Sequence, residues 1–221
     1  MTDAVHEVKN PVAAIRAASE SLESGEASPE RQRRVARIVR ESATRLDRLV
    51  TELLELSRAE AGMPGEERGP VDLAALAAAV AEGVSADPRF SGVAVRASAK
   101  VDRAVVDGVA SRLEAALREV VTNAASFCGE RGAVEVTVDA DDAYVTVRVE
   151  DDGPGIEASA LPHVFDRFFT TRAEQKGTGL GLAMVKAVIE AHGGRVEASS
   201  DGGRGARLTL RLPRARGVNA P

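Results

Sequence analysis

Two long apolar stripes at helical spacing dominate the first 61 residues. Residues 4–24 and 30–61 carry Val, Ile and Leu at intervals of three and four, with Arg and Glu between them. The stripes are separated by SGEASPER, in which Ser28 and Pro29 are typical of a helix start. The pattern predicts a hairpin of two long helices. Because a lone hairpin cannot bury both stripes well, we expect two copies to pair into a four-helix bundle.

The pattern changes after a Gly- and Pro-rich segment, AGMPGEERGP, which is typical of a linker. Helical stretches such as ASRLEAALREVVTNAASF alternate with runs of period two, among them GVAVRAS, RAVVDG, GAVEVTVDA, AYVTVRVE, RVEASS and ARLTLRL. This order favours an α+β sandwich. We therefore expect an α+β protein with a helical hairpin at 1–61, a linker at 62–70, an α/β-sandwich domain at 71–213 and a C-terminal tail at 214–221.

Composition limits the possible partners and compartments. The net charge of −5 argues against a nucleic-acid binder, since phosphate contacts need a basic surface. The single cysteine, Cys128, excludes an internal disulfide and fits a reducing compartment. The most apolar run, 73–84, contains Glu82 and is shorter than the roughly 18–20 residues that span a bilayer. We expect a cytoplasmic chain, which could be the cytoplasmic portion of a larger membrane-bound protein.

Glu119 and Asn123 lie four residues apart in a predicted helix, so their side chains share one face. A carboxylate and an amide oxygen together suit a hard cation such as Mg²⁺. The alternative is a pair of polar residues on a solvated face, and taken alone this pair favours the alternative.

Two further segments have the composition of ligand-binding loops. VEDDGPGI ends a predicted strand, and Asp151 there could accept a hydrogen bond from an exocyclic amine such as that of adenine. KGTGLGLAMVKAV places alternating glycines before a predicted helix, whose N-terminal N–H groups can bind phosphate. It is neither a P-loop nor a dinucleotide fingerprint. Each segment alone could be an ordinary turn.

LPHVFDRFFTTRAEQ lies between these two segments and holds three of the five Phe residues. It is typical of a hydrophobic anchor followed by a lid over a nucleotide. A surface loop pinned by aromatic side chains is the alternative.

Taken together and in order, the motifs resemble those of the sensor histidine kinases, over essentially the whole chain. HEVKNP resembles the H-box, REVVTNAASF the N-box, DDGPGI the G1 box, FDRFF the F-box and GTGLGL the G2 box, and GRGARLTLRLP resembles the terminal glycine box. The resemblance implies a dimerisation and histidine-phosphotransfer hairpin at 1–61 and a Bergerat-type ATP-binding domain at 71–213. It also implies ATP and Mg²⁺ as cofactors, a homodimer, and a response regulator receiver domain as partner.

The resemblance implies a role for each matching residue. His6 would accept the phosphoryl group, Glu7 would act as general base, and Asn10 would position water in a phosphatase reaction. Asn123 and Glu119 would hold the metal ion. The nucleotide site would comprise Asn123, Asp151, Gly153, Gly155, Arg167, Lys176, Gly177, Thr178, Gly179, Leu180 and Gly181.

The sequence departs from the family pattern at three places. Glu119 stands where many histidine kinases have Asn, and Ser126 stands where a Lys often reaches the phosphates. The chain begins only five residues before His6, whereas the first helix of the family usually starts further upstream. We therefore expect an upstream signalling or membrane segment that is absent from this chain, and fraying of the helix end beside His6.

Two other functions remain open from the sequence. One is a serine kinase or ATPase that shares the ATP-binding fold, which the hairpin and HEVKNP disfavour. The other is a non-catalytic dimeric scaffold, which the intact Asn123, Asp151 and glycine motifs disfavour. Whether phosphoryl transfer occurs within or between subunits depends on the handedness of the hairpin turn, which the residues do not fix.

Overall fold

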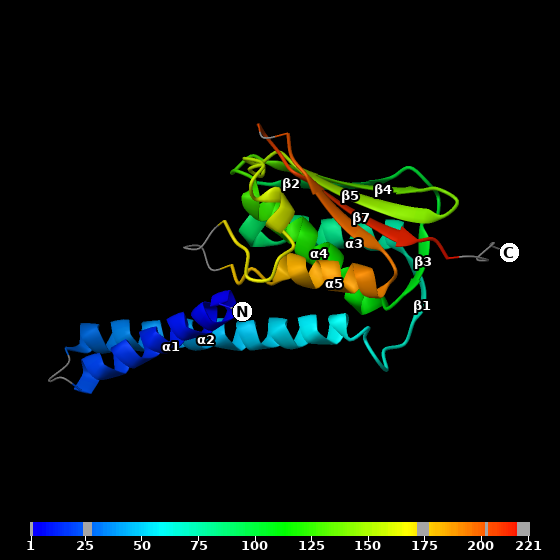
Figure 1. Cartoon of the computed structure of the whole chain (residues 1–221). Coiled ribbons are helices and arrows are strands. Elements are labelled where there is room, and N and C mark those ends of the chain that lie inside the picture. The colour runs from blue at the N-terminus through cyan, green and yellow to red at the C-terminus, as the bar shows by residue number, and fades with distance from the viewer. Residues whose placement is uncertain (1, 24–27, 172–176, 202, 216–221) are drawn as a thin grey trace.

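The N-terminal part is a hairpin of two long helices (Figure 1). The computed structural model describes residues 2–23, 28–171, 177–201 and 203–215, except for the side chains of residues 2–7 and 23. Helix α1 (Thr2–Glu23) and helix α2 (Pro29–Glu60) confirm the two predicted helices. Ser28 caps α2 as expected, because its hydroxyl accepts a hydrogen bond from the Arg31 N–H at 3.3 Å.

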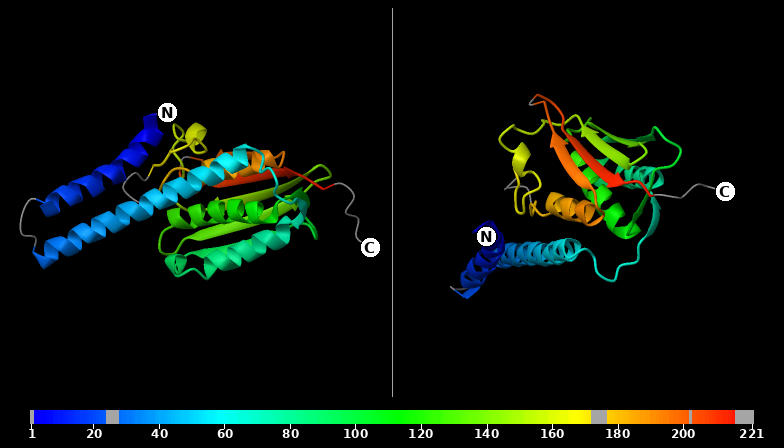
Figure 2. Two further views of the ribbon diagram at one scale, coloured as in Figure 1. Left: turned by 90° about the horizontal axis from the view of Figure 1, so that it is seen from below. Right: turned by 45° about the vertical axis from the view of Figure 1, so that its right-hand side comes forward.

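The C-terminal part places three helices against a mixed five-stranded sheet, which confirms the α+β class (Figures 1 and 2). The sheet order is β2-β4-β5-β7-β6, in which β2 and β4 are parallel and the other pairs antiparallel. A second, two-stranded sheet pairs β1 with β3. The elements are β1 (Gly69–Asp72), α3 (Leu73–Ser85), η1 (Pro88–Phe90), β2 (Ala94–Ala99), β3 (Val105–Gly108), α4 (Ala110–Phe127), β4 (Ala133–Ala140), β5 (Tyr144–Asp151), η2 (Leu161–His163), α5 (Gly181–Ala191), β6 (Arg195–Ser199) and β7 (Arg207–Pro213).

The core lies between the sheet and helices α3, α4 and α5. Alternate side chains of β4, β5 and β7 are buried beneath the helices, and they are Val134, Val136, Val138, Val145, Val147, Val149, Leu208, Leu210 and Leu212. The opposite face carries polar side chains, including Arg207, which pairs with Glu150. One buried and one solvated face explain why the strand sequences alternate with period two.

Helix α2 belongs to both parts of the molecule. Its first half packs on α1, while its second half runs beside α5 (Figures 1 and 2). Leu49, Leu56 and Ala59 of α2 are buried in the same hydrophobic core as the sheet and its helices. Apolar packing along α2 therefore fixes the position of the C-terminal domain against the hairpin.

The hairpin nevertheless exposes large apolar side chains. Val50 and Leu54 are each 56% exposed, and the other exposed apolar side chains of the hairpin are Val8, Val12, Leu22 and Leu53. Such a surface agrees with the expected pairing of two hairpins. Within the part of the chain that the structure describes, no helix is both long enough and apolar enough to cross a membrane.

His192 is a buried side chain that joins the end of α5 to the start of α4. Its Nε2 accepts a hydrogen bond from the Val109 N–H at 3.0 Å, and its Nδ1 lies 2.7 Å from the Val188 carbonyl oxygen. The ring is therefore the neutral tautomer with the proton on Nδ1. Burial lowers the pKa of His192 below its ordinary value of 6.5.

This burial predicts an acid-sensitive fold. Because the folded pKa lies below the unfolded one, His192 stabilises the fold above pH 6.5, and the contribution is lost as pH falls through the folded pKa. Urea unfolding from pH 8 to pH 5 should show that His192→Gln flattens the loss of stability on acidification. The change in slope is at most about 1.4 kcal/mol per pH unit for one proton. Parallel pH profiles for His192→Gln and wild type would contradict the assignment.

Candidate functional site

The residues of the HEVKNP motif lie at the start of helix α1. His6 and Glu7 fall within this helix, although their side chains lie outside the described part of the structure. Asn10 is exposed one turn further along, and the helix continues through Pro11. The backbone therefore places His6 and Asn10 on one side of a helix, as their spacing of four predicts.

Asp151 lies at the end of β5, where three glycine-containing segments meet. Its Oδ1 accepts hydrogen bonds from the N–H groups of Gly153 at 2.9 Å and Ala206 at 3.4 Å. Burial raises the pKa of Asp151, while these hydrogen bonds oppose the rise. Both described hydrogen bonds use Oδ1, which leaves Oδ2 to accept from a ligand amine.

The terminal glycine motif closes this part of the site. Gly205 donates its N–H to the Gly153 carbonyl at 2.7 Å, and it has a φ of +77°. A side chain at this position would overlap the Asp151 carbonyl oxygen, so only glycine permits the approach. Gly155 lies in the loop that follows β5. The next residue, Ile156, donates its N–H to the Ser200 hydroxyl at 3.0 Å. The sequence motif was recognised, but its contact with Asp151 was not predicted.

Glu119 and Asn123 lie one turn apart on α4, as predicted. Both side chains are half-buried, and the Glu119 carboxylate lies directly against Gly181 at the start of α5. A Cβ at position 181 would overlap this carboxylate, so a larger residue there would displace the end of the Glu119 side chain. Burial raises the pKa of Glu119, the negative charge of Glu52 adds to the rise, and Arg48 opposes it.

These two oxygen donors fit a Mg²⁺ ion held jointly with nucleotide phosphates. Among the described residues, no group of three or more His, Cys, Asp or Glu side chains forms a metal cage. Mg²⁺ commonly takes one or two protein oxygens and completes its shell with phosphate and water. Glu119 and Asn123 are therefore the residues that would hold the ion.

The GTGLGL segment lies between the Phe-rich segment and α5. The Gly179 carbonyl accepts a hydrogen bond from the Phe168 N–H at 2.8 Å, so the GTGLGL segment and the Phe-rich segment are in direct backbone contact. Thr178 is 4% exposed, and Leu180 is fully buried at the N-cap of α5. Gly177 is half-buried at the near end of the segment. The N-terminal end of α5 supplies N–H groups of the kind that bind phosphate.

Two residues of the predicted nucleotide site contact helix α2. The Thr178 hydroxyl donates a hydrogen bond to Glu52, and Arg167 pairs with Glu60. In this arrangement Arg167 therefore binds helix α2. Lys176, which the resemblance also places in the nucleotide site, lies outside the described residues.

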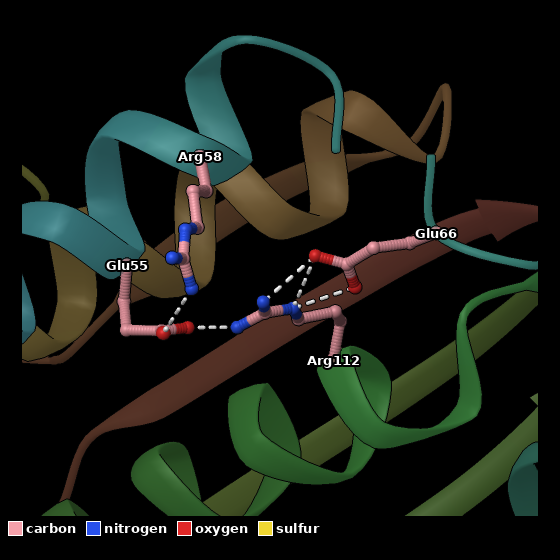
Figure 3. Close-up of polar contacts among 4 residues, drawn as sticks. All are labelled: Glu55, Arg58, Glu66 and Arg112. Carbon is pink, nitrogen blue, oxygen red and sulfur yellow. Dashed lines mark hydrogen bonds and ion pairs between the residues drawn. The ribbon is translucent and has the colours of Figure 1, made fainter. Parts of the chain in front are cut away.

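Arg112 at the start of α4 pairs with acids of α2 and of the segment that follows it (Figure 3). Its guanidinium pairs with Glu55 of α2 and, at 2.7 Å, with Glu66 of the segment that follows α2. Arg58 approaches the same Glu55 carboxylate at 3.5 Å. The sequence pattern predicts no role for Arg112 or the α2 acids, because charged residues on an amphipathic helix ordinarily face solvent.

Cys128 lies beside the Asp151 loop but is not a nucleophile. Burial, assisted by Asp152, raises the pKa of its thiol to about 11. The thiol is therefore protonated near neutral pH, unlike the thiolates of reactive cysteines.

Comparison with known proteins agrees with this two-part arrangement. Residues 1–62 match the family model of the His Kinase A (phospho-acceptor) domain. Residues 108–216 match that of the histidine kinase-, DNA gyrase B- and HSP90-like ATPases. Sensor histidine kinase ZraS of Escherichia coli O157:H7 is 34% identical over 209 residues, which make up 94% of this chain and 44% of ZraS. The chain thus spans less than half the length of that relative.

Solved structures resemble the whole chain as well. Full-length ShkA in complex with AMPPNP gives a TM-score of 0.71 at 27% identity, covering 94% of this chain and 42% of ShkA. Histidine kinase ThkA in complex with response regulator protein TrrA gives a TM-score of 0.73 at 22% identity, covering 96% of this chain and 60% of that chain, which is a likeness of fold. Since both family models match in the order in which the two parts occur, the chain belongs to the sensor histidine kinases of two-component systems.

Proposed function

We propose that this chain is an ATP-dependent protein-histidine kinase that phosphorylates His6 and passes the phosphoryl group to an aspartate of a response regulator. One observation carries the proposal. Asp151, the glycine segments and the Glu119–Asn123 face converge in one domain, which is packed directly on the hairpin that bears His6.

Each residue contributes positioning or charge to the proposed transfer. Asp151 holds the adenine amine, and the GTGLGL segment lines the phosphates with backbone N–H groups. Mg²⁺, held by Asn123 and Glu119, would neutralise phosphate charge. A neutral His6 ring nitrogen attacks the γ-phosphorus as the bond to ADP breaks, and Glu7 takes the proton that the ring releases.

The same chain supports a homodimer and a partner protein as parts of this proposal. The exposed apolar side chains of the hairpin would be buried by a second copy. The solved complex of ThkA with a response regulator protein is consistent with a receiver domain as the phosphoryl acceptor. We place the reaction in the cytoplasm, where ATP and response regulators occur together.

Loss of His6 should abolish phosphorylation of the chain. With γ-labelled ATP and Mg²⁺, the wild type should acquire label that is labile to acid and stable to alkali, whereas His6→Gln should acquire none. His163→Gln is the matched control and should label normally. Acid-stable label that survives the His6 change would favour a serine kinase, and phosphate release without phosphoprotein would favour an ATPase.

Removing the Asp151 carboxylate should weaken nucleotide binding. A hydrogen bond to a charged group contributes about 1.5–3 kcal/mol, so Asp151→Asn should raise the Kd for Mg-AMPPNP at least about tenfold. The measurement is isothermal titration calorimetry. Asp142→Asn removes the same charge from the turn at the opposite end of β5 and should bind like the wild type. Equal affinities for the two variants would refute the adenine role of Asp151.

Phosphatase activity rests on Asn10, which is exposed one turn from His6. If its amide positions the attacking water, Asn10→Ala should slow dephosphorylation of the cognate response regulator about tenfold to a hundredfold. Autophosphorylation of His6 should persist, which separates a lost water contact from a misfolded hairpin. Lys9→Ala, at the adjacent exposed residue, is the control. Unchanged dephosphorylation in Asn10→Ala would remove the phosphatase role.

A further inference from the structure

Helix α2 presents a carboxylate to the glycine segment that is proposed to line the phosphates. Oε2 of Glu52 accepts a hydrogen bond from the Thr178 hydroxyl, and Oε1 accepts one from the Arg48 Nε at 2.6 Å. The Thr178 side chain is buried, so Glu52 occupies the position from which a ligand would accept the Thr178 hydroxyl proton, just before α5. Carboxylate and phosphate oxygens are both anionic acceptors, and a single hydroxyl proton serves one of them at a time.

The space between α2 and this segment is too small for a nucleotide. The crevice that Glu52, Glu119 and Gly181 help to line has a volume of about 140 Å³. Sites for small molecules typically enclose about 300–1,000 Å³. Because Glu52 already accepts the Thr178 hydroxyl proton, phosphates must displace this carboxylate to accept from the same donor.

The contact also brings two carboxyl groups together. Glu52 faces Glu119 across the crevice, and its negative charge adds to the effect of burial in raising the pKa of Glu119. Like charges in a partly buried site oppose each other. The contact between α2 and the C-terminal domain therefore needs attractive charge pairs at other places to offset this repulsion.

Arg112 and Arg167 supply those opposite charges. Arg112 holds Glu55 and Glu66 (Figure 3), and Arg167 holds Glu60. The side chains of Arg112, Glu55 and Glu66 are 21%, 35% and 25% exposed, so water reaches these ion pairs. Partly solvated ion pairs are individually weak, and the contact can therefore open.

We propose that Glu52 is an intramolecular competitor for the nucleotide phosphates, held in place by the Arg112 ion pairs. This inference rests on the proposed function, because it requires the GTGLGL segment to bind phosphate. Nucleotide binding and release of the C-terminal domain from α2 are then coupled. We call the arrangement in which Glu52 contacts Thr178 the docked state. By linkage, a change that weakens the docked state strengthens the apparent affinity for nucleotide, and bound nucleotide weakens the docked state by the same factor.

The first test compares the affinities of the full chain and of Glu52→Gln for Mg-AMPPNP by isothermal titration calorimetry. Loss of one charge-assisted hydrogen bond from the docked state should lower the apparent Kd about three- to tenfold. Glu41→Gln removes the same charge from an exposed position about three turns earlier on α2 and should bind like the wild type. A Glu52→Gln affinity within twofold of wild type would overturn the proposal.

Arg112→Gln separates docking from simple electrostatics. If the charge near the anionic ligand alone sets the affinity, Arg112→Gln should weaken nucleotide binding, because it removes a positive charge. Under the same assumption Glu52→Gln should strengthen binding, because it removes a negative charge. If Arg112 acts by holding the docked state, its loss also strengthens binding, by about two- to fivefold. Tighter binding in both variants supports the proposal, and opposite effects overturn it. Thermal unfolding of each variant verifies that it is folded.

The proposed function and this inference fail in different ways. If the wild type and both variants bind no nucleotide, the kinase proposal fails and the competitor role of Glu52 fails with it. If all three proteins bind with one affinity, nucleotide binding stands and the role of Glu52 is refuted.

Discussion

The apolar stripe of helix α2 packs against two different surfaces along its length. Near its start it packs on α1, and near its end Leu49, Leu56 and Ala59 join the core beneath the sheet. One continuous helix thus joins the hairpin to the C-terminal domain in the arrangement that the structure describes. The other contacts described here, including those of Arg112 and Thr178, exist because this packing brings their elements together.

The charges on α2 follow the same division. Its first half is rich in arginine, whereas Glu52, Glu55 and Glu60 of its second half meet Thr178, Arg112 and Arg167 of the C-terminal domain. Apolar packing supplies an attraction that has no direction, and the ion pairs select one register along the helix. Because the ion pairs are partly solvated, they specify the docked position more than they stabilise it.

Sequence patterns predicted the features that depend on local spacing. Period and capping located the helices and Ser28, and alternation located the strands other than β1 (Gly69–Asp72), because these signals arise within a few residues. Strand β1 begins inside the segment predicted as a linker and is too short to show alternation. The patterns could not show that β2 pairs with the distant β4 while β3 pairs with β1 in a separate sheet. They also missed the contacts of Glu52 and Arg112. Contacts between residues dozens of positions apart produce no periodic pattern in the sequence. A charged residue on a helix is therefore predicted to face solvent unless its partner is known.

The two ends of the proposed nucleotide site are built on different principles. At the adenine end, Asp151 is fixed by N–H groups of Gly153 and Ala206 and covered by Gly205, so its geometry depends on backbone that cannot exchange partners. At the phosphate end, Thr178 and Arg167 are side-chain donors already engaged by acids of α2. A ligand can therefore meet a preformed site for its base before it displaces the helix from the groups that would hold its phosphates. If the proposed site binds nucleotide in this order, phosphate contact, and not base contact, is the step that would couple nucleotide binding to the position of the hairpin.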